Sequence, residues 1–353
     1  MTSKAFELAR LGSVYSDGAL SNRNLIINGA MQVAQRGTSA SVTNNTNEGY
    51  QTLDRWRFNF GNSAGGACTV SQDTDVPSGY GFSNSYKVDV TTADTSIAST
   101  HHILFGQRIE AQDLRNSGWN YTSSSSHLTL SFWVKSNKTG VYCISASLPD
   151  VGSNFRFVKE VTINSASTWE YKTVKIFGDS SAVINNDNGL GMDLEWNLQT
   201  ASDRDEATDN AWHTADASRC TSNQVNFFDS TSNNLWITGV QLEVGDTDTP
   251  FEHRSYGDEL ARCQRYYYSI THDGTNRWGI DGLYSNGTGA ALNFSWTHPT
   301  TMRTDPTFTA GDSISNTTYY PRKEFMNIMR NNQSTGRVGI EFSSGTSEWD
   351  AEL

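Results

Sequence analysis

The clearest pattern in the chain is a strict alternation of apolar and polar residues in HLTLSFWVKS, residues 127–136. The apolar residues of one face are Leu128, Leu130, Phe132 and Val134. The other face carries Thr129, Ser131, Trp133 and Lys135. A period of two is typical of a strand with one buried face, so this segment predicts a half-buried antiparallel strand.

Similar runs occur along residues 24–254. They are NLIINGAMQV (24–33), LDRWRFNF (53–60), HHILFGQRI (101–109), VYCISASL, RFVKEVTI, WEYKTVKIF and LWITGVQLEV. Short strands separated by polar turns, with no helical pattern between them, predict a jelly-roll β-sandwich over residues 24–254. Two long connections, Ala111–Ser126 and Gln199–Gln224, interrupt the series, and connections of this length are often functional or disordered.

A domain boundary is expected near residue 255. Ser255 and Asp258 resemble a helix capping box, and a single apolar stripe of spacing 4, 3 and 4 follows. The stripe consists of Tyr256, Leu260, Cys263 and Tyr267. The runs RYYYSI, GAALNFSW, EFMNIMR and RVGIEFSS then predict strands, so residues 255–353 are expected to form a short helix and a smaller C-terminal β-domain.

The first 23 residues differ from the rest. AFELARLGSV favours a short helix with Phe6, Leu8 and Leu11 as its apolar residues. A stretch this short has no core of its own, so it is frayed or docks onto another protein.

Composition excludes several classes of protein. The 353 residues are 36% hydrophobic, 18% charged and 11% aromatic, which fits neither a disordered chain nor a coiled-coil rod. With 26 basic against 38 acidic residues the net charge is −12, so the surface repels phosphate backbones and a nucleic-acid partner is not expected. No apolar run suits a membrane span or a secretory signal, so we expect a protein that is made and used in soluble form, or is released by lysis.

Catalytic and metal motifs are not found. The chain has no GxxxxGK[ST], GxGxxG, GxSxG or HExxH, so no cofactor and no catalytic residue is assigned. His101 and His102 point to opposite faces of a strand, so we expect no shared metal. An acidic loop without the EF-hand glycine is expected to be solvated rather than a calcium site; it contains Asp203, Asp205, Glu206, Asp209 and Asp216.

The cysteines and one pair of carboxylates bear on the chemistry. Cys68, Cys143, Cys220 and Cys263 form no CxxC pair and are expected to be buried free thiols in a reducing compartment.

Asp193 and Glu195 share a face of the predicted strand GMDLEWNL, which is the best arrangement for glycoside hydrolysis in this chain. Among 38 acidic residues, however, such a coincidence is common.

Aromatic residues in polar surroundings are more informative. A sugar ring has an apolar face and a rim of hydroxyls, so an aromatic plane flanked by short polar side chains suits it. Trp119, Tyr121, Trp133 and Trp212 have such neighbours. The alternative is that Trp133 packs against a partner subunit and the others fasten their own loops.

Several motifs together resemble a family of tailed-bacteriophage fibre proteins. NLIINGAMQVAQRGTS (24–39) and LDRW (53–56) are similar to the opening of such proteins, WITGVQLEVGDTDTPFEHRSYGDELARCQRYY (236–267) to their hinge, and DAEL (350–353) to their ending. The resemblance implies a virion structural protein with a carbohydrate-binding-module-like jelly roll, usually trimeric, without enzyme activity.

The resulting hypothesis is a tail fibre or appendage located in the virion that adsorbs to a host surface glycan. The N-terminal arm would dock onto other virion proteins of the tail or head, and the C-terminal domain would face the host. Its candidate receptor residues are Trp278, Tyr284 and Trp296, with Trp119, Tyr121 and Trp212 second; Trp296 is alternatively a core residue. The alternatives are a tail adaptor or capsid decoration without receptor binding, and a glycan depolymerase.

We predict a homotrimer that meets along the stripe of Tyr256, Leu260, Cys263 and Tyr267. Two heptads are too short to associate alone, so the flanking β-domains should supply most of the interface. Light scattering should give three times the 39.0 kDa mass of the chain. A monomer mass at micromolar concentration contradicts the trimer, and the stripe then packs on its own chain.

Overall fold

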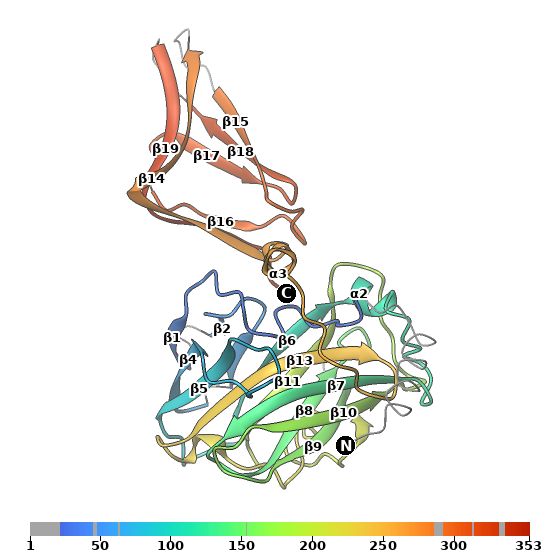
Figure 1. The fold of residues 1–353 in the computed structure, drawn as a ribbon. Helices are drawn as coiled ribbons and strands as arrows, with labels where there is room; N and C mark the ends of the chain where they lie inside the picture. The colour runs from blue at the N-terminus through green and yellow to red at the C-terminus, as the bar shows by residue number, and fades with distance from the viewer. Residues whose placement is uncertain are drawn as a thin grey trace. The chain divides into compact units, whose positions relative to one another are not determined.

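The computed structural model describes residues 22–44, 48–62, 64–152, 154–285, 292–312, 314–331 and 336–353. The side chains of residues 273–285, 292 and 336–340 lie outside this description, as do Phe6, Leu8 and Leu11. The chain divides into two compact units, and each is treated separately here (Figure 1). The sandwich unit comprises the described residues up to Ser255 together with Leu353, and the C-terminal unit is Tyr256–Glu352.

The sandwich unit is the predicted antiparallel jelly-roll β-sandwich. Its six-stranded sheet has the order β1 (Ser39–Thr43), β4 (Ala67–Asp73), β5 (Ser85–Thr92), β13 (Asn234–Val244), β7 (His127–Ser136), β10 (Glu170–Phe177). Its seven-stranded sheet has the order β12 (Ala211–His213), β9 (Arg156–Ile163), β8 (Gly140–Ser147), β11 (Leu190–Thr200), β6 (His102–Glu110), β3 (Arg57–Gly61), β2 (Gly49–Tyr50). The short α2 (Ala111–Arg115) and the 3₁₀ helix η1 (Phe227–Asp229) lie in connections.

One hydrophobic core lies between these two sheets. The predicted alternation of β7 is confirmed, because Leu128, Leu130, Phe132 and Val134 are all buried in it. At its centre Trp196 of β11 stacks on Phe105 of β6, with ring centroids 5.6 Å apart and planes 9° apart. The edge of Phe132 meets the same indole at 5.5 Å, so aromatic contacts join the two layers.

The segment NLIINGAMQV is not a strand, contrary to the sequence prediction. Residues 22–33 run irregularly, because Asn28 and Met31 both adopt a φ of 59°, in the left-handed region that an extended strand does not contain. Gly29 lies so close to β13 that an added Cβ would be 2.1 Å from Val240 O. The predicted strand 53–60 is also shorter in the structure, since β3 begins at Arg57.

A network of buried polar groups fastens this irregular segment to β13 and to the chain that follows β13. We call it the clamp; its members are Arg23, Asn24, Gln241, Glu243, Thr249, Glu252 and Arg254. Asn24 Oδ1 accepts hydrogen bonds from the backbone amides of Ile26 (2.9 Å) and Leu242 (3.0 Å). Arg254 Nη1 donates to Ile26 O at 3.0 Å. Two segments more than 200 positions apart in sequence are therefore held side by side.

The C-terminal unit begins with α3 (Tyr256–Gln264), which is one turn shorter than the predicted helix. One three-stranded sheet has the order β14 (Tyr267–Ser285), β19 (Gly336–Asp350), β16 (Thr307–Thr309), and the other has the order β15 (Leu292–Thr297), β18 (Phe325–Arg330), β17 (Thr317–Pro321). Both sheets contribute to a second core, in which Trp349 stacks on Tyr268 at 4.4 Å. None of the helices in the described part of the chain has the length and apolar character needed to traverse a lipid bilayer.

Replacing Asn24 with Ala should destabilise the sandwich unit. The side chain is buried, and its loss leaves the amides of Ile26 and Leu242 without an acceptor. Two orphaned buried donors cost about 2–4 kcal/mol of unfolding free energy, measurable by urea denaturation. Asn186→Ala is the control, since Asn186 is exposed and its one side-chain bond is to Asn116 on the surface. Equal stability of the two variants would contradict the role of the clamp.

Candidate functional site

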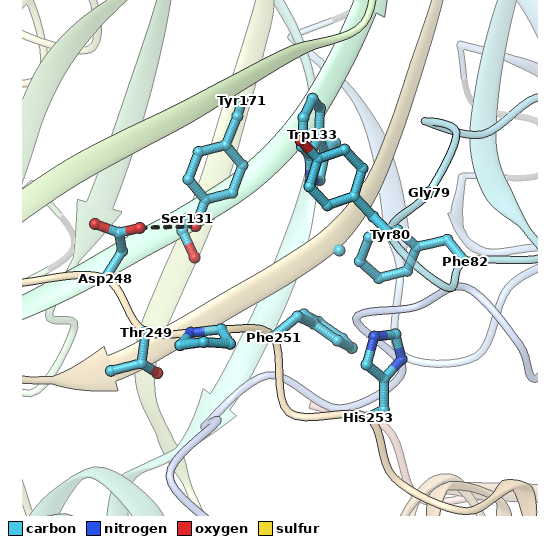
Figure 2. A pocket seen from close by; sticks show the side chains of 12 residues that line it. Gly79, Tyr80, Phe82, Ser131, Trp133, Tyr171, Asp248, Thr249, Phe251 and His253 are labelled. Atoms are coloured by element: carbon cyan, nitrogen blue, oxygen red, sulfur yellow. Dashed lines mark hydrogen bonds between the residues drawn. The ribbon is translucent and has the colours of Figure 1, made fainter. Parts of the chain in front are cut away.

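The candidate site is a cavity of about 520 Å³ in the sandwich unit. Its floor is the outward face of the six-stranded sheet, where Ser131 and Trp133 of β7 and Tyr171 of β10 project away from the core. One wall is the loop between β4 and β5, and the other is the segment 248–253 after β13 (Figure 2). We call this cavity the aromatic pocket.

Three aromatic rings line one side of the pocket. Tyr171 lies directly opposite Trp133 in the β-ladder, and their ring centroids are 5.2 Å apart. Tyr80 contacts the other side of Trp133 at 4.3 Å. Tyr80 and Tyr171 are 53% and 41% exposed, so both retain ring surface that a ligand can reach.

The second side of the pocket is a cluster of Phe82, Phe251 and His253 (Figure 2). Phe82 contacts Phe251 edge-to-face at 5.0 Å and His253 at 5.3 Å. Gly239 makes room for this cluster, because a Cβ there would lie 2.5 Å from the Phe82 ring, and its φ of 62° suits glycine. The glycine in WITGVQ thus serves the shape of the pocket.

Polar groups stand between the two aromatic sides. The Tyr171 hydroxyl donates to Asp248 Oδ2 at 3.1 Å. Burial, together with the neighbouring Asp248 carboxylate, raises the pKa of Tyr171 to about 12, so the hydroxyl remains protonated at neutral pH. The pocket therefore combines flat apolar surfaces with a hydroxyl, a carboxylate and the side chains of Ser131 and Thr249.

The clamp holds the 248–253 wall in place. Thr249 donates its amide and its hydroxyl to the two carboxylate oxygens of Glu243, at 2.9 and 2.6 Å. The Glu252 amide donates to Gln241 Oε1 at 2.8 Å. Burial alone raises the pKa of Glu252, but hydrogen bonds from the Asn24 and Asn22 amides and the charge of Arg254 outweigh burial and lower it.

Of the sequence-predicted aromatic candidates in the sandwich unit, Trp133 lines this pocket, whereas Trp119, Tyr121 and Trp212 do not. Trp119 is only 3% exposed and belongs to the core, where it contacts Tyr121 at 6.3 Å. Trp212 is half-buried and stacks on Phe155 at 4.7 Å. Its indole nitrogen donates to the backbone of Phe177 at 2.8 Å. In these positions the two indoles fasten their own loops, which is the alternative considered from the sequence.

The candidates of the C-terminal unit are not brought to one described surface. Trp278 and Tyr284 lie in β14, where their backbones pair with Phe342 and Arg337, and their side chains are outside the described residues. Trp296 is half-buried against the second core, and its indole donates to the Tyr268 hydroxyl at 3.1 Å.

The predicted stripe does not continue along one helix, because Tyr256, Leu260 and Cys263 lie in α3 whereas Tyr267 begins β14. Cys263 and Tyr267 are buried within the chain, and the Tyr267 hydroxyl donates to Glu348 at 2.7 Å. Leu260 is half-buried and Tyr256 is 57% exposed. Only these last two residues of the stripe are therefore accessible to another copy without rearrangement.

Asp193 and Glu195 do share one face of β11, as the sequence predicts. Both are buried, and Arg57 Nη2 bridges them at 2.8 Å and 3.1 Å. Arg219 adds a second contact to Glu195 at 3.0 Å. Burial raises the pKa of Asp193, whereas Arg219 and Arg57 overcome burial and lower the pKa of Glu195. This arrangement is an ion-pair network, and both carboxylates are committed to arginines.

The predicted solvated acidic loop has partners of its own. Asp209 pairs with Lys159 at 2.6 Å, and Asp216 pairs with Arg204 at 2.7 Å. His102 is buried, and burial together with Arg219 lowers its pKa to about 3. Among the described residues, no three His, Cys, Asp or Glu side chains gather in a way that suits a metal ion.

Sequence reasoning noted Trp133 but missed the other residues that line the pocket with it. The sequence could have revealed Tyr171. Val174 and Ile176 of the same strand face the core, and Tyr171 lies an odd number of positions away from both, so its side chain is on the outward face. Tyr80, Phe251 and His253 come from loops, and no periodicity signals their position.

Comparison with known proteins gives the following results. No protein-family model matches the chain, and no curated protein matches it. Among solved structures, the enzymatically active domain of bacteriophage CBA120 tailspike protein 4 aligns with 63% of this chain and 21% of its own, at 14% identity and a TM-score of 0.34.

Two carbohydrate-binding modules also align with the chain. A CBM4 structure aligns over 62% of this chain and 98% of its own, at 14% identity and a TM-score of 0.33. The family 11 module of the Clostridium thermocellum cellulase Lic26A-Cel5E aligns over 61% and 98%, at 12% identity and a TM-score of 0.27. Matches at these TM-scores carry no argument about the chemistry of the pocket.

Acid should weaken the pocket wall through Glu252. Folding lowers the pKa of the Glu252 carboxyl below its ordinary value of 4.5. Its charged form therefore stabilises the fold at pH values above 4.5, and this contribution is lost as the pH falls through the folded-state pKa. Glu252→Gln should therefore lower the melting temperature most at neutral pH, and the deficit should shrink below pH 4.5. The exposed Glu206→Gln is the control, and a Glu252→Gln deficit that is constant with pH would contradict this role.

Proposed function

We propose that this protein is a structural component of a phage particle, a tail fibre or similar appendage, that binds a surface glycan of the host through the aromatic pocket. The observation that carries the glycan part is the pairing of accessible tyrosine and tryptophan rings with hydroxyl and carboxylate groups in one cavity of about 520 Å³. Aromatic faces cover the apolar face of a sugar ring, while Tyr171, Asp248 and Ser131 offer donors and acceptors to its hydroxyls.

The virion part of the proposal is supported by the sequence motifs. The resemblance of residues 24–39, 53–56 and 236–267 to phage fibre proteins extends over both units of the chain. In this proposal the N-terminal arm docks onto another virion protein, and three copies of the chain raise the apparent affinity through avidity. The pocket, rather than Trp278, Tyr284 and Trp296, is the first candidate for the receptor site.

A glycan depolymerase is the second candidate, because Asp193 and Glu195 share one face of β11. Their ion pairs with Arg57 and Arg219 make this candidate the weaker one. Release of reducing ends from a polysaccharide that the protein binds would establish it.

The proposal predicts that Tyr171→Ala weakens glycan binding about 10- to 100-fold at a single site, since stacking of a ring on a ligand contributes about 1–3 kcal/mol. Binding is measured on an array of bacterial surface polysaccharides and then by calorimetry with the glycan retained by the wild type. Tyr320→Ala is the matched control, because Tyr320 is 40% exposed against 41% for Tyr171 and lies in the other unit.

Three results would contradict the proposal. If no array glycan is retained, or if both variants bind equally, the pocket is not the glycan site. If the protein is missing from purified particles, the virion role is wrong. In particles, Tyr171→Ala should reduce adsorption to host cells and Tyr320→Ala should not.

A further inference from the structure

Two of the four buried cysteines lie side by side on the opposite sheet. Cys143 is in the middle of β8, and Cys220 lies in the long connection between β11 and β13. Both side chains are 0% exposed and form a small apolar cluster with Val158. Thr221, the residue that follows Cys220 in the chain, contacts Cys143 Sγ, so the two cysteines are close neighbours in this cluster.

Neighbouring threonines hold each sulfur in place. The Thr221 amide donates to Cys143 Sγ at 3.4 Å, and the Thr221 hydroxyl lies 3.5 Å from the same sulfur. The Thr200 hydroxyl lies 3.0 Å from Cys220 Sγ. Each sulfur is thus held by a threonine, Cys220 by Thr200 of β11 and Cys143 by Thr221 of the connection.

The structure points to a modification site: we propose that Cys143 and Cys220 are an oxidisable dithiol that closes to an intrachain disulfide when the protein meets a low-molecular-weight disulfide. Such a bond needs two cysteines that are close neighbours in the fold, and Cys143 and Cys220 share one buried cluster. The other two cysteines, Cys68 in β4 and Cys263 in α3, belong to separate parts of the chain.

The two thiols differ in reactivity. Hydrogen bonds from Cys220 and Thr221 outweigh burial and lower the pKa of Cys143, whereas burial raises the pKa of Cys220. Cys143 is therefore the better attacking thiolate. Burial raises the pKa of Cys68, which makes it a poor nucleophile.

The exchange with oxidised glutathione is balanced. The Cys143 thiolate attacks one sulfur of the oxidised glutathione and displaces one glutathione thiolate, which leaves a mixed disulfide. Cys220 then attacks Cys143 Sγ and displaces the second glutathione. One S–S bond breaks and one forms, the two protein thiols lose two electrons in total, and their protons pass to the two glutathiones released.

Access to the sulfurs requires the covering connection to open. Within residues 201–224, regular pairing is limited to the three-residue β12 and the isolated bridges of Asp205, Glu206 and Gln224. Further backbone hydrogen bonds hold this connection, among them Ala207 N to Cys220 O at 2.9 Å and Cys220 N to Arg204 O at 3.1 Å. Reagent therefore enters when these bonds open locally, which does not require global unfolding. Once closed, the disulfide fastens this connection, with its neighbouring Arg219–Glu195 ion pair, to β8.

The test incubates the full-length protein with oxidised glutathione or with dithiothreitol, then unfolds it in an alkylating reagent and measures its mass. We expect two alkylated thiols instead of four after oxidation, and a peptide map that joins Cys143 to Cys220. The melting temperature should rise by about 5–15 °C, because the bond closes a long loop in the unfolded chain.

Variants separate this pair from the other cysteines. Cys143→Ala and Cys220→Ala should abolish the mass change and the thermal shift, while Cys68→Ala should keep both. Four alkylated thiols in the oxidised wild type, a persistent glutathione adduct or a bond to another cysteine would overturn the proposal. The wild-type mass result stands even if a variant fails to fold.

Discussion

The structure depends most on the buried carboxylate of Glu243. It is 2% exposed, so it must be compensated, and its partners are Arg23, Gln241 and Thr249. Leaving such a charge without partners costs about 3–5 kcal/mol. To supply them, the chain after β13 folds back over its own strand and the N-terminal segment lies along its other side. One electrostatic requirement thereby closes the sandwich and builds a wall of the aromatic pocket.

The two outward faces of the sandwich are chemically different. The six-stranded sheet presents Trp133 and Tyr171, whose rings are partly accessible in the aromatic pocket. The seven-stranded sheet presents Asp193 and Glu195, which are buried and matched by Arg57 and Arg219. These ion pairs bind both carboxylates to arginine side chains.

The residues that carry the resemblance to phage fibres serve mainly to fold the chain. Asn24 and Glu252 belong to the clamp, and the Trp56 indole donates to Asn28 O at 3.1 Å. Gly239 admits the Phe82 ring beside the pocket. Tyr80 and Tyr171 of the aromatic pocket lie outside those motifs.

The sequence by itself determined the all-β class, the alternation of β7 and the position of α3, because period and capping are local properties. It also placed Asp193 and Glu195 on one face. The tertiary structure decided the rest. The pattern of NLIINGAMQV predicts a strand. The structure has none there, because Asn28 and Met31 adopt left-handed backbone angles and Gly29 lies close to the backbone of β13.

The polar neighbours of Trp119 predict an exposed loop residue, but the structure buries its side chain in the core. The pocket joins Tyr80, Trp133 and Phe251 from three distant segments, and no local pattern encodes that proximity, because it follows from strand order and from the burial of one charge.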